Sequence, residues 1–337
     1  MPVITYDKQP YRCEAGETVL QCLRRHGVTI PSSCESGVCQ TCLMRGIQGR
    51  PPVDAQQGLR DTLRAQRYFL ACICKPGEDM EVVPEGAGVT HLLEAEVKAK
   101  EWLGTDILRV LLRPLRPFEY KPGQFINLFR PDGLARSYSL ASLPQDDECL
   151  ELHVRVLADG NMGTWMRDEM RPGDRLAFEG PVGDCFYVPG RPGQDILLVG
   201  TGTGLAPLWG ILRDALAHGH HGRLHLFHGS RTADGLYRMD ELRALERTHG
   251  NFTYTPCVDA GDTADASGIT LNRADLAALE AIPALAGWRI FLCGHPEMVS
   301  VMKKRAFLAG ASLNDIYADP FVHSTAGHAG SRDSGGG

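Results

Sequence analysis

The sequence predicts a multidomain protein that combines an α+β domain, an antiparallel β-barrel and a doubly wound α/β domain. The chain has 337 residues, whereas one domain usually has roughly 100 to 200. The local pattern also changes twice, from a cysteine-rich region to short strands with Pro and Gly turns, and then to alternating strands and helices. We therefore expect domains over residues 1–88, 92–190 and 194–323.

The first segment mixes strand and helix signals. "VITYDKQPYRC" is strand-like, and "ETVLQCLRRHG" places Val19, Leu20 and Leu23 on one helical face that stops at Gly27. A cysteine-rich loop follows, and the segment closes with "MEVV". The next stretch, "PEGAGVTH", has few core-forming side chains and is predicted to be a linker.

The second and third segments differ in how their strands are connected. Residues 92–190 contain six strand-like runs separated by Pro and Gly turns, which predicts an antiparallel barrel. From residue 194 strands alternate with helices, beginning with "DILLVG", and this alternation predicts a parallel sheet with helices on both faces. The final "STAGHAGSRDSGGG", residues 324–337, is predicted to be disordered.

Composition argues against two kinds of partner. A net charge of −6 and a pI near 6.1 give no electrostatic reason to expect nucleic acid or an anionic membrane surface. No apolar run reaches the roughly 18 residues that a membrane span needs, and "MPVITYDKQP" lacks the layout of a signal peptide. We expect a soluble, cytoplasmic protein.

The eleven cysteines are better explained by metal binding than by disulfides. Their number is odd and no export signal is visible, whereas disulfide scaffolds are typical of short secreted chains. "CESGVCQTC" places Cys34, Cys39 and Cys42 in a C-x4-C-x2-C pattern, which is the spacing of plant-type [2Fe–2S] ferredoxins. Zinc is the alternative, but zinc sites usually have two short knuckles and this region has one.

The cysteine loop resembles the ferredoxin domain of the plant-type family, which has a β-grasp fold. The resemblance rests on "CESGVCQTC" and on the cysteine of "LAC" 30 residues later. It implies that Cys34, Cys39, Cys42 and Cys72 hold the cluster, with Cys72 rather than Cys74 as the fourth ligand.

Two motifs of the second segment suggest a flavin site. In "RSYSLAS", preceded by "KPGQF", an arginine beside alternating aromatic and hydroxyl side chains can neutralise a phosphate, stack on a flat ring and bond its edge. An ordinary amphipathic strand is the alternative. "DGNMGTWM" adds a glycine-containing loop that opens a short helix, where a pyrophosphate can bind.

Together these motifs resemble the flavin-binding barrel of the ferredoxin-NADP reductase superfamily. The resemblance implies that Arg136 contacts the FAD pyrophosphate, that Tyr138 lies against the isoalloxazine and that Ser139 bonds near its reactive N5. The backbone groups implied to hold phosphate oxygens belong to Met162, Gly163 and Thr164.

The third segment carries two motifs of the same superfamily. "LLVGTGTGLAP" puts a glycine turn between a buried strand and a helix, although its spacing departs from G-x-G-x-x-G. The resemblance assigns nucleotide binding to Gly200, Gly202, Thr203 and Gly204. "FLCGHPEM" resembles the C-G-x-P-x-M segment, which implies that Cys293 and Gly294 lie beside the nicotinamide. A buried thiol at a strand end is the alternative for Cys293.

The sequence is less clear about two features, the preference for NADH or NADPH and the residue that covers the flavin. The usual acidic partner of the ribose 2′-OH is missing, and Ser230 and Arg231 stand there instead, which leaves NADH and NADPH both open. In "YADPF", the resemblance makes Phe321 a candidate cover for the flavin face, with Asp319 polar beside it. The alternative is an aromatic residue that closes the core. Ser139, Cys293 and Phe321 are thus the candidate catalytic residues.

The order of the three segments predicts the activity. NAD(P)H gives up two electrons together as hydride and a [2Fe–2S] cluster accepts one at a time, so a flavin must stand between them. The chain resembles the reductase component of multicomponent bacterial oxygenases, especially those acting on aromatic rings. This implies an oxygenase or hydroxylase partner, reached directly or through an intermediate ferredoxin. A reductase for a deoxysugar dehydrase and a non-enzymatic iron–sulfur carrier or sensor are the alternatives.

Overall fold

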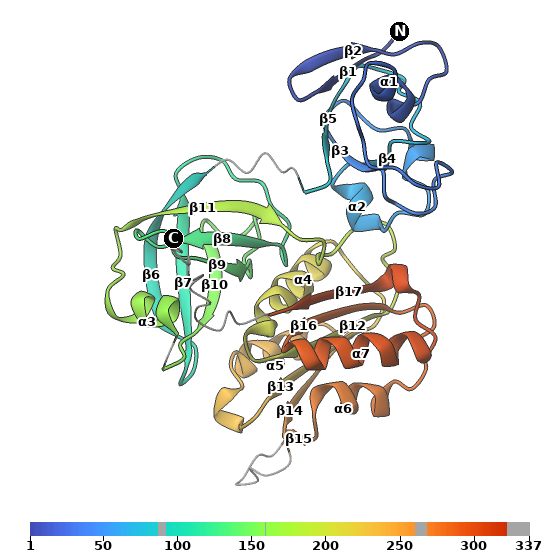
Figure 1. The fold of residues 1–337 in the computed structure, drawn as a ribbon. Helices are drawn as coiled ribbons and strands as arrows, with labels where there is room; N and C mark the ends of the chain where they lie inside the picture. The colour runs from blue at the N-terminus through green and yellow to red at the C-terminus, as the bar shows by residue number, and fades with distance from the viewer. Residues whose placement is uncertain (87–91, 159, 260–267, 322–337) are drawn as a thin grey trace, which may run out of the picture.

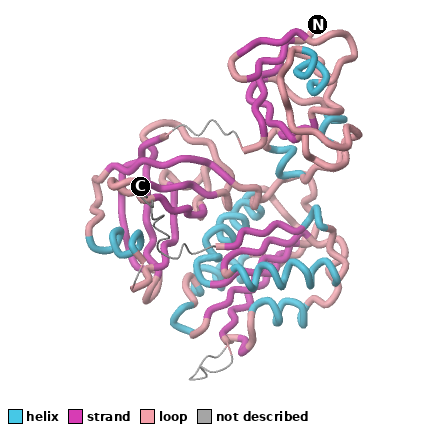
Figure 2. The backbone as a smooth tube through the Cα atoms, viewed as in Figure 1, coloured by secondary structure: helices cyan, strands magenta, loops and turns pink. Residues whose placement is uncertain are grey.

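The computed structural model contains three β-sheets, one in each predicted segment (Figure 1). Helices gather in the third segment, whereas the other two consist mainly of strands and loops (Figure 2). The residues that the structure describes are 1–86, 92–158, 160–259 and 268–321. Most of the predicted linker and the predicted disordered tail lie outside them. Within the described ranges, no helix combines the length and the apolar character that a membrane crossing requires.

The N-terminal sheet has five strands in the order β2-β1-β5-β3-β4. The strands are β1 (Val3–Tyr6), β2 (Gln9–Arg12), β3 (Leu43–Gln48), β4 (Tyr68–Leu70) and β5 (Met80–Pro84). Strands β1 and β5 are parallel, and the remaining pairs are antiparallel. Helix α1 (Val19–Arg25) contributes buried residues to the core, as expected for a β-grasp fold.

Helix α1 carries the predicted apolar face and stops before Gly27, as the sequence predicts, and its start is capped. The Thr18 side chain accepts a hydrogen bond from the Gln21 backbone N–H, and the Gln21 side chain accepts one from the Thr18 N–H, which forms a capping box. The helix gives way to Gly27, whose φ of 82° suits glycine. The sequence did not predict the short helices η1 (Val53–Gln56) and α2 (Asp61–Ala65).

The middle sheet is antiparallel, with the strand order β10-β7-β6-β11-β8-β9. Its strands are β6 (Leu93–Trp102), β7 (Ile107–Pro114), β8 (Phe125–Phe129), β9 (Ala135–Ser139), β10 (Leu150–Arg155) and β11 (Arg175–Val182). The Ala141 N–H, just after β9, donates to the Glu151 carbonyl of β10 at 2.9 Å, so the two outer strands meet. The predicted antiparallel barrel is confirmed, and α3 (Asn161–Asp168) follows β10.

The C-terminal sheet is parallel throughout, with the order β15-β14-β13-β12-β16-β17. Its strands are β12 (Ile196–Thr201), β13 (Leu224–Ser230), β14 (Phe252–Val258), β15 (Thr270–Leu271), β16 (Arg289–Gly294) and β17 (Ile316–Pro320). The helices are α4 (Leu205–Ala217), α5 (Met239–Thr248), α6 (Ala274–Ala281) and α7 (Pro296–Leu308), with the short turns η2 (Gly202–Gly204), η3 (Ala233–Gly235) and η4 (Leu313–Asp315).

Two hydrophobic cores show that the sheet is doubly wound. Helices α4 and α5 share one core with Leu198 of β12, whereas α6 and α7 share the other with Leu197 and Val199. Neighbouring residues of a strand face opposite sides, so the two helix layers cover opposite faces. The predicted doubly wound sheet is confirmed, and its strand order reverses between β12 and β16. Ligands bind at such a switch point.

Candidate functional site

The cysteine loop turns sharply at three positions between Cys34 and Cys42. Glu35, Gly37 and Gln40 all have positive φ, at 50°, 80° and 59°. This conformation turns backbone N–H groups inward. The Cys34 sulfur accepts hydrogen bonds from the N–H groups of Ser36 and Cys39, at 3.5 and 3.3 Å.

These donors favour the thiolate form. Hydrogen bonds from the Ser36 side chain and from backbone N–H groups lower the pKa of Cys34 to about 5. The Thr41 hydroxyl, 3.2 Å from the Cys39 sulfur, and backbone N–H groups lower the pKa of Cys39. Thiolates are the form that binds metal, so this loop is preorganised for ligation.

The other two predicted ligands form a second, more buried pair. Burial and a hydrogen bond with Cys42 raise the pKa of Cys72 to about 11. Cys74 lies deeper: its pKa is raised to about 12 by burial, and its amide donates to the Leu70 carbonyl. The geometry therefore favours Cys72 over Cys74 as the fourth ligand.

The arrangement suits two metal ions better than one. Around a single tetrahedral zinc ion, four thiolates at about 2.3 Å from the metal would all lie within about 4 Å of one another. Among the described residues, no three of the predicted ligand sulfurs lie within 4.8 Å of one another, whereas the ligand atoms of Cys13, Glu17 and Cys22 do. Two pairs of thiols fit a two-iron cluster.

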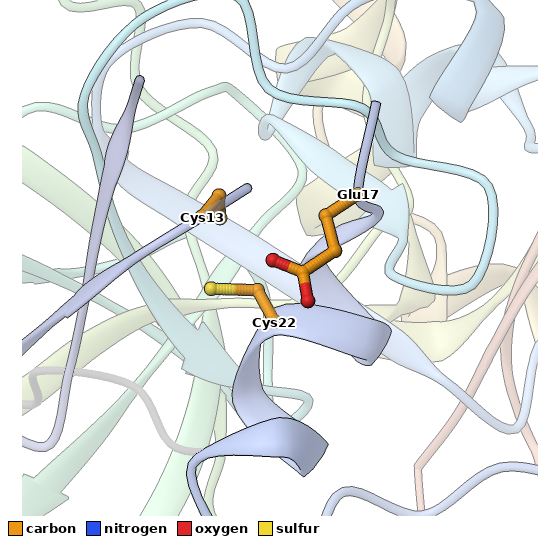
Figure 3. A group of neighbouring side chains, drawn as sticks. All are labelled: Cys13, Glu17 and Cys22. Atoms are coloured by element: carbon orange, nitrogen blue, oxygen red, sulfur yellow. The ribbon is translucent and has the colours of Figure 1, made fainter. Parts of the chain in front are cut away.

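The Cys13, Glu17 and Cys22 side chains turn toward one another beside α1 (Figure 3). The Glu17 carboxylate is already engaged, because Arg25 donates to it at 2.7 and 3.0 Å and lowers its pKa to about 2. Burial raises the pKa values of both thiols. The neighbouring guanidinium and the protonated thiols argue against a cation here.

A cavity of about 830 Å³ lies between the barrel and the parallel sheet. Several predicted cofactor residues line it: Arg136, Tyr138, Ser139, Met162, Gly163, Thr203 and Phe321. The structure thus brings together residues that are up to 185 positions apart, by the difference between 321 and 136.

Strand β9 contributes a buried polar contact to this cavity. The Ser139 hydroxyl donates to the Asp319 carboxylate at 3.4 Å. Burial raises the pKa of Asp319 to about 6, so this carboxyl changes its charge near neutral pH. Burial also raises the pKa of Tyr138, which keeps its hydroxyl protonated.

The start of α3 supplies donors to the same cavity. The amides of Met162 and Gly163 belong to the first turn, where N–H groups have no partner within the helix. A side chain at Gly163 would place its Cβ 3.0 Å from the Arg155 carbonyl, so this position packs tightly against β10 and favours glycine. The predicted phosphate contact of Thr164 needs correction, because its amide donates to the Gly160 carbonyl at 2.9 Å.

The glycine turn lies at the carboxyl end of β12, beside that of β16. At Gly202, where φ is 55°, a Cβ would meet the Arg155 guanidinium at 3.0 Å. A Cβ at Gly204 would lie 2.3 Å from the Cys293 carbonyl, and one at Gly200 would lie 2.6 Å from Leu208. Gly200 and Gly204 therefore allow close packing, and Thr203 is the member of this turn that lines the cavity.

Cys293 and Gly294 end β16 at this crevice. Cys293 is fully buried and its sulfur lies 3.7 Å from that of Cys185. Gly294, with φ of 116°, leaves no room for a Cβ, which would lie 2.6 Å from the Thr201 carbonyl oxygen. The Gly294 carbonyl accepts a hydrogen bond from the Phe321 amide at 2.8 Å. This bond fixes Phe321 at the mouth of the cavity.

Ser230 and Arg231 lie at the end of β13, outside the cavity lining. Thr201 and Gly229 are neighbours across β12 and β13, so the ends of these two strands lie side by side. Arg231 is exposed. An exposed arginine beside the glycine turn is accessible to the far end of a bound dinucleotide.

Sequence reasoning missed two polar residues of the crevice, His153 and Arg155 on β10. Arg155 lines the cavity and pairs with Asp106 at 3.0 Å. His153 lines it too, and its ring nitrogens contact the Tyr237 hydroxyl at 2.9 Å and Glu151 at 2.8 Å. The available signal was the strand "CLELHVRVL", in which polar residues at every second position share one face.

Three domain families match the chain. The "2Fe-2S iron-sulfur cluster binding domain" matches residues 4–77, the "Oxidoreductase FAD-binding domain" matches residues 94–187, and the "Oxidoreductase NAD-binding domain" matches residues 198–304. Their order is the order in which the three sheets occur along the chain. The predicted cofactors, a [2Fe–2S] cluster, FAD and NAD(P)H, are thereby confirmed.

Characterised relatives cover nearly the whole chain. The reductase subunit of aromatic O-demethylase from Amycolatopsis sp. is 37% identical over 92% of this chain and 95% of its own length. The ferredoxin–NAD(P)+ reductase component of the naphthalene 1,2-dioxygenase system of Pseudomonas putida is 34% identical over 91% of this chain and 94% of its own.

Solved structures give the same result. The Amycolatopsis cytochrome P450 reductase GcoB is 33% identical, with a TM-score of 0.65 over 95% of this chain and 99% of that one. The ferredoxin reductase in carbazole 1,9a-dioxygenase has a TM-score of 0.64 over 95% and 98%. This chain belongs to the family of iron–sulfur flavoprotein reductases that serve as reductase components of multicomponent oxygenases. It is an oxidoreductase, so the alternative of a non-enzymatic carrier is wrong.

Proposed function

We propose that this protein supplies electrons, one at a time, to a cytoplasmic oxygenase or hydroxylase that acts on an aromatic compound. The relatives named above support the partner class, since they serve an aromatic O-demethylase and a naphthalene dioxygenase. The low-pKa thiols and the nicotinamide donor suit a reducing compartment. The observation that carries the proposal is that one chain combines all three redox modules.

The partner would meet the protein at the cysteine loop. Cys34 and Cys39 are exposed, and Val38 between them is 76% exposed, so an apolar side chain stands at the loop surface. An exposed apolar residue at the centre of a contact area is typical of a docking site. Electrons would leave from this loop, either to the oxygenase or to an intermediate ferredoxin.

Different residues of the cavity would bind different parts of the flavin cofactor. Arg136 and the free amides of Met162 and Gly163 would bind the pyrophosphate, and Arg155 would add a second positive charge between that site and the glycine turn. Tyr138 would lie against the ring system. When bound, the flavin accepts hydride from NAD(P)H and releases the electrons singly.

Ser139 and Asp319 would serve the hydride step. Asp319 can exchange a proton near neutral pH, and the Ser139 hydroxyl, 3.4 Å away, would connect it to a bound flavin. Cys293 would form the floor beneath the nicotinamide, and Phe321 would cover the flavin until the nucleotide arrives. Ser230 and Arg231 would contact the ribose end of the nucleotide.

A comparison of two electron acceptors tests this route. In Cys42→Ser the cluster is lost, and reduction of cytochrome c should stop, whereas ferricyanide, a small acceptor, should still take electrons from the flavin. Ser139→Ala should slow both activities, by roughly 5- to 150-fold if a buried hydrogen bond worth about 1 to 3 kcal/mol is lost. Full cytochrome c reduction by the cluster-free variant would contradict the serial route. Reconstitution with a candidate oxygenase and its aromatic substrate then tests the partner.

A further inference from the structure

Helix α2 of the N-terminal domain lies against the start of the nucleotide-binding sheet (Figure 1). Its first residue, Asp61, is only 11% exposed. One carboxylate oxygen accepts a hydrogen bond from the Tyr317 hydroxyl of β17. The other accepts from Arg289 of β16 and from Arg191 at 3.0 Å. A single carboxylate therefore binds three donors of the reductase half.

The arginine at the centre of this contact depends on Asp61. The Arg289 side chain is 2% exposed, and its partners among the described residues are the Val188 carbonyl at 3.0 Å and the Asp61 carboxylate. Arg191 has an additional partner in Asp315, at 2.6 Å. Removing one member of a buried ion pair leaves an uncompensated charge, which is strongly unfavourable. Asp61 is thus the charge that neutralises Arg289.

Contacts on both sides of Asp61 join the same two halves. The Arg60 guanidinium donates to the Leu313 carbonyl at 3.0 Å and lies over the Tyr317 ring, 5.5 Å from its centre. Beyond the helix, the Gln66 side chain accepts a hydrogen bond from Gln124 at 3.4 Å. The helix is therefore held at both of its ends, and Asp61 makes its most buried charged contact, beside an ion pair of Arg60 with Asp184 at 3.5 Å.

This contact places the cysteine loop near the flavin cavity. A pocket of about 450 Å³ lies between the two halves beside this contact. It is lined by Gln40 and Leu43 on one side and by Gly183 and Asp184 on the other. Gln40 and Leu43 directly follow Cys39 and Cys42 in the sequence. A Cβ at Gly183 would lie 3.2 Å from the Phe125 ring, and Phe125 lines the flavin cavity. The loop and the cavity wall are neighbours across this space.

We propose that Asp61 is a positioning residue that docks the iron–sulfur domain for electron transfer from the flavin to the cluster. The proposal rests on the serial route proposed above. In the step concerned, one electron leaves the reduced flavin and one is gained by the cluster, with no bond formed or broken. The docked state brings donor and acceptor into range, and Asp61 determines how much of the protein occupies that state.

The test removes the negative charge of Asp61 while preserving the shape of its side chain. Asp61→Asn keeps the side chain's size but leaves Arg289 without a carboxylate. Asp54→Asn is the matched control, because Asp54 is exposed in the same domain and contacts only Gln57, at 3.4 Å, among the described residues. Asp61→Glu is the conservative variant. Should Asp61→Asn fail to fold, Arg191→Gln removes one donor at a half-exposed position and replaces it in the test.

Two readouts separate docking from general damage. In stopped-flow experiments, NADH should reduce the flavin of Asp61→Asn at the wild-type rate, whereas transfer to the cluster and cytochrome c reduction should fall at least tenfold. Hydrogen exchange, which needs no turnover, should rise at the amides of residues 60–66 and 313–317. Asp54→Asn should match the wild type, Asp61→Glu should recover part of the rate, and Arg191→Gln should show a two- to fivefold loss.

Different results would contradict the docking role of Asp61 and the serial electron route. Unchanged cytochrome c reduction together with unchanged exchange in Asp61→Asn would overturn the docking role. A parallel loss of ferricyanide and cytochrome c activity in that variant, with the flavin retained, would also overturn it, because Asp61 would then act on the hydride step. Full cytochrome c reduction by cluster-free Cys42→Ser would instead overturn the route itself.

Discussion

The protein contains two pairs of neighbouring thiols whose environments are opposite. Cys34 and Cys39 are exposed on a loop, where hydrogen-bond donors lower the pKa of Cys34 to about 5. Cys185 and Cys293 are buried with their sulfurs 3.7 Å apart, and burial raises the pKa of Cys293 well above its ordinary value. Proximity of two thiols therefore does not decide their chemistry. Nearby N–H donors on an exposed loop favour the thiolate form of Cys34, whereas deep burial keeps the Cys293 thiol protonated.

The largest effect should come from removing the loop thiols. Each of Cys34→Ser, Cys39→Ser, Cys42→Ser and Cys72→Ser should abolish the [2Fe–2S] signal in electron paramagnetic resonance of the reduced protein, because each removes one ligand. Cys74→Ser is the control and should keep the signal, since this side chain lies in the core. A signal that is lost in Cys74→Ser and kept in Cys72→Ser would identify Cys74, rather than Cys72, as the fourth ligand.

Alkylation rates should measure the difference between the exposed and the buried thiol pair directly. In protein freed of its cluster, iodoacetamide at pH 7 should modify Cys34 more than about a hundredfold faster than Cys293, because Cys34 is nearly all thiolate and less than about 1% of Cys293 is. Mass spectrometry of digested samples measures both rates. Urea provides the control, because unfolding should bring the two rates together. Equal rates in the folded protein would remove the distinction between the pairs.

Asp319 allows a test of how strongly burial disfavours a charged side chain in the cavity. Its pKa is raised from 3.8 to about 6, so the folded protein holds this proton more tightly than the unfolded chain. The resulting stabilisation is complete below pH 4 and is lost as the pH rises through 6. Asp319→Asn should therefore raise the free energy of unfolding at pH 8 by roughly 2 to 3 kcal/mol, at 1.36 kcal/mol per pKa unit.

Urea unfolding at pH 4 and pH 8 measures this effect. The variant should gain stability at pH 8 and little at pH 4, whereas Asp234→Asn, at an exposed position, should change neither value appreciably. The same gain at both pH values would indicate a packing effect rather than burial of charge.

The smallest effect concerns the exposed charge of Arg231. Arg231→Ala should change the ratio of kcat/KM for NADPH over NADH several-fold, by removing a contact worth about 1 kcal/mol, and should leave the flavin content unchanged. Steady-state kinetics with both nucleotides and the flavin absorbance check this. An unchanged ratio would place Arg231 outside the ribose site.

The elements were predictable to different degrees. The strands and helices of the third segment follow from their hydrophobic period, and the end of α1 follows from Gly27. The short helix α2 was not predicted, because five residues carry too little periodic signal. The amide of Thr164 was assigned to a phosphate, although the helix uses it. A motif gives the residues of a turn but does not show which backbone groups are already bonded.

The sequence by itself determined the loop, the order of the three domains and hence the class of reaction. The cysteine spacing and the glycine turns are local, and local geometry follows from residues that are near in sequence. Tertiary structure alone decided that Asp319 meets Ser139, that Arg155 meets Gly202 and that Asp61 meets Arg289. These partners are 47 to 228 positions apart, from 202 minus 155 and 289 minus 61. Their pairing depends on how whole sheets pack, because no local pattern encodes which distant charge a buried group will meet.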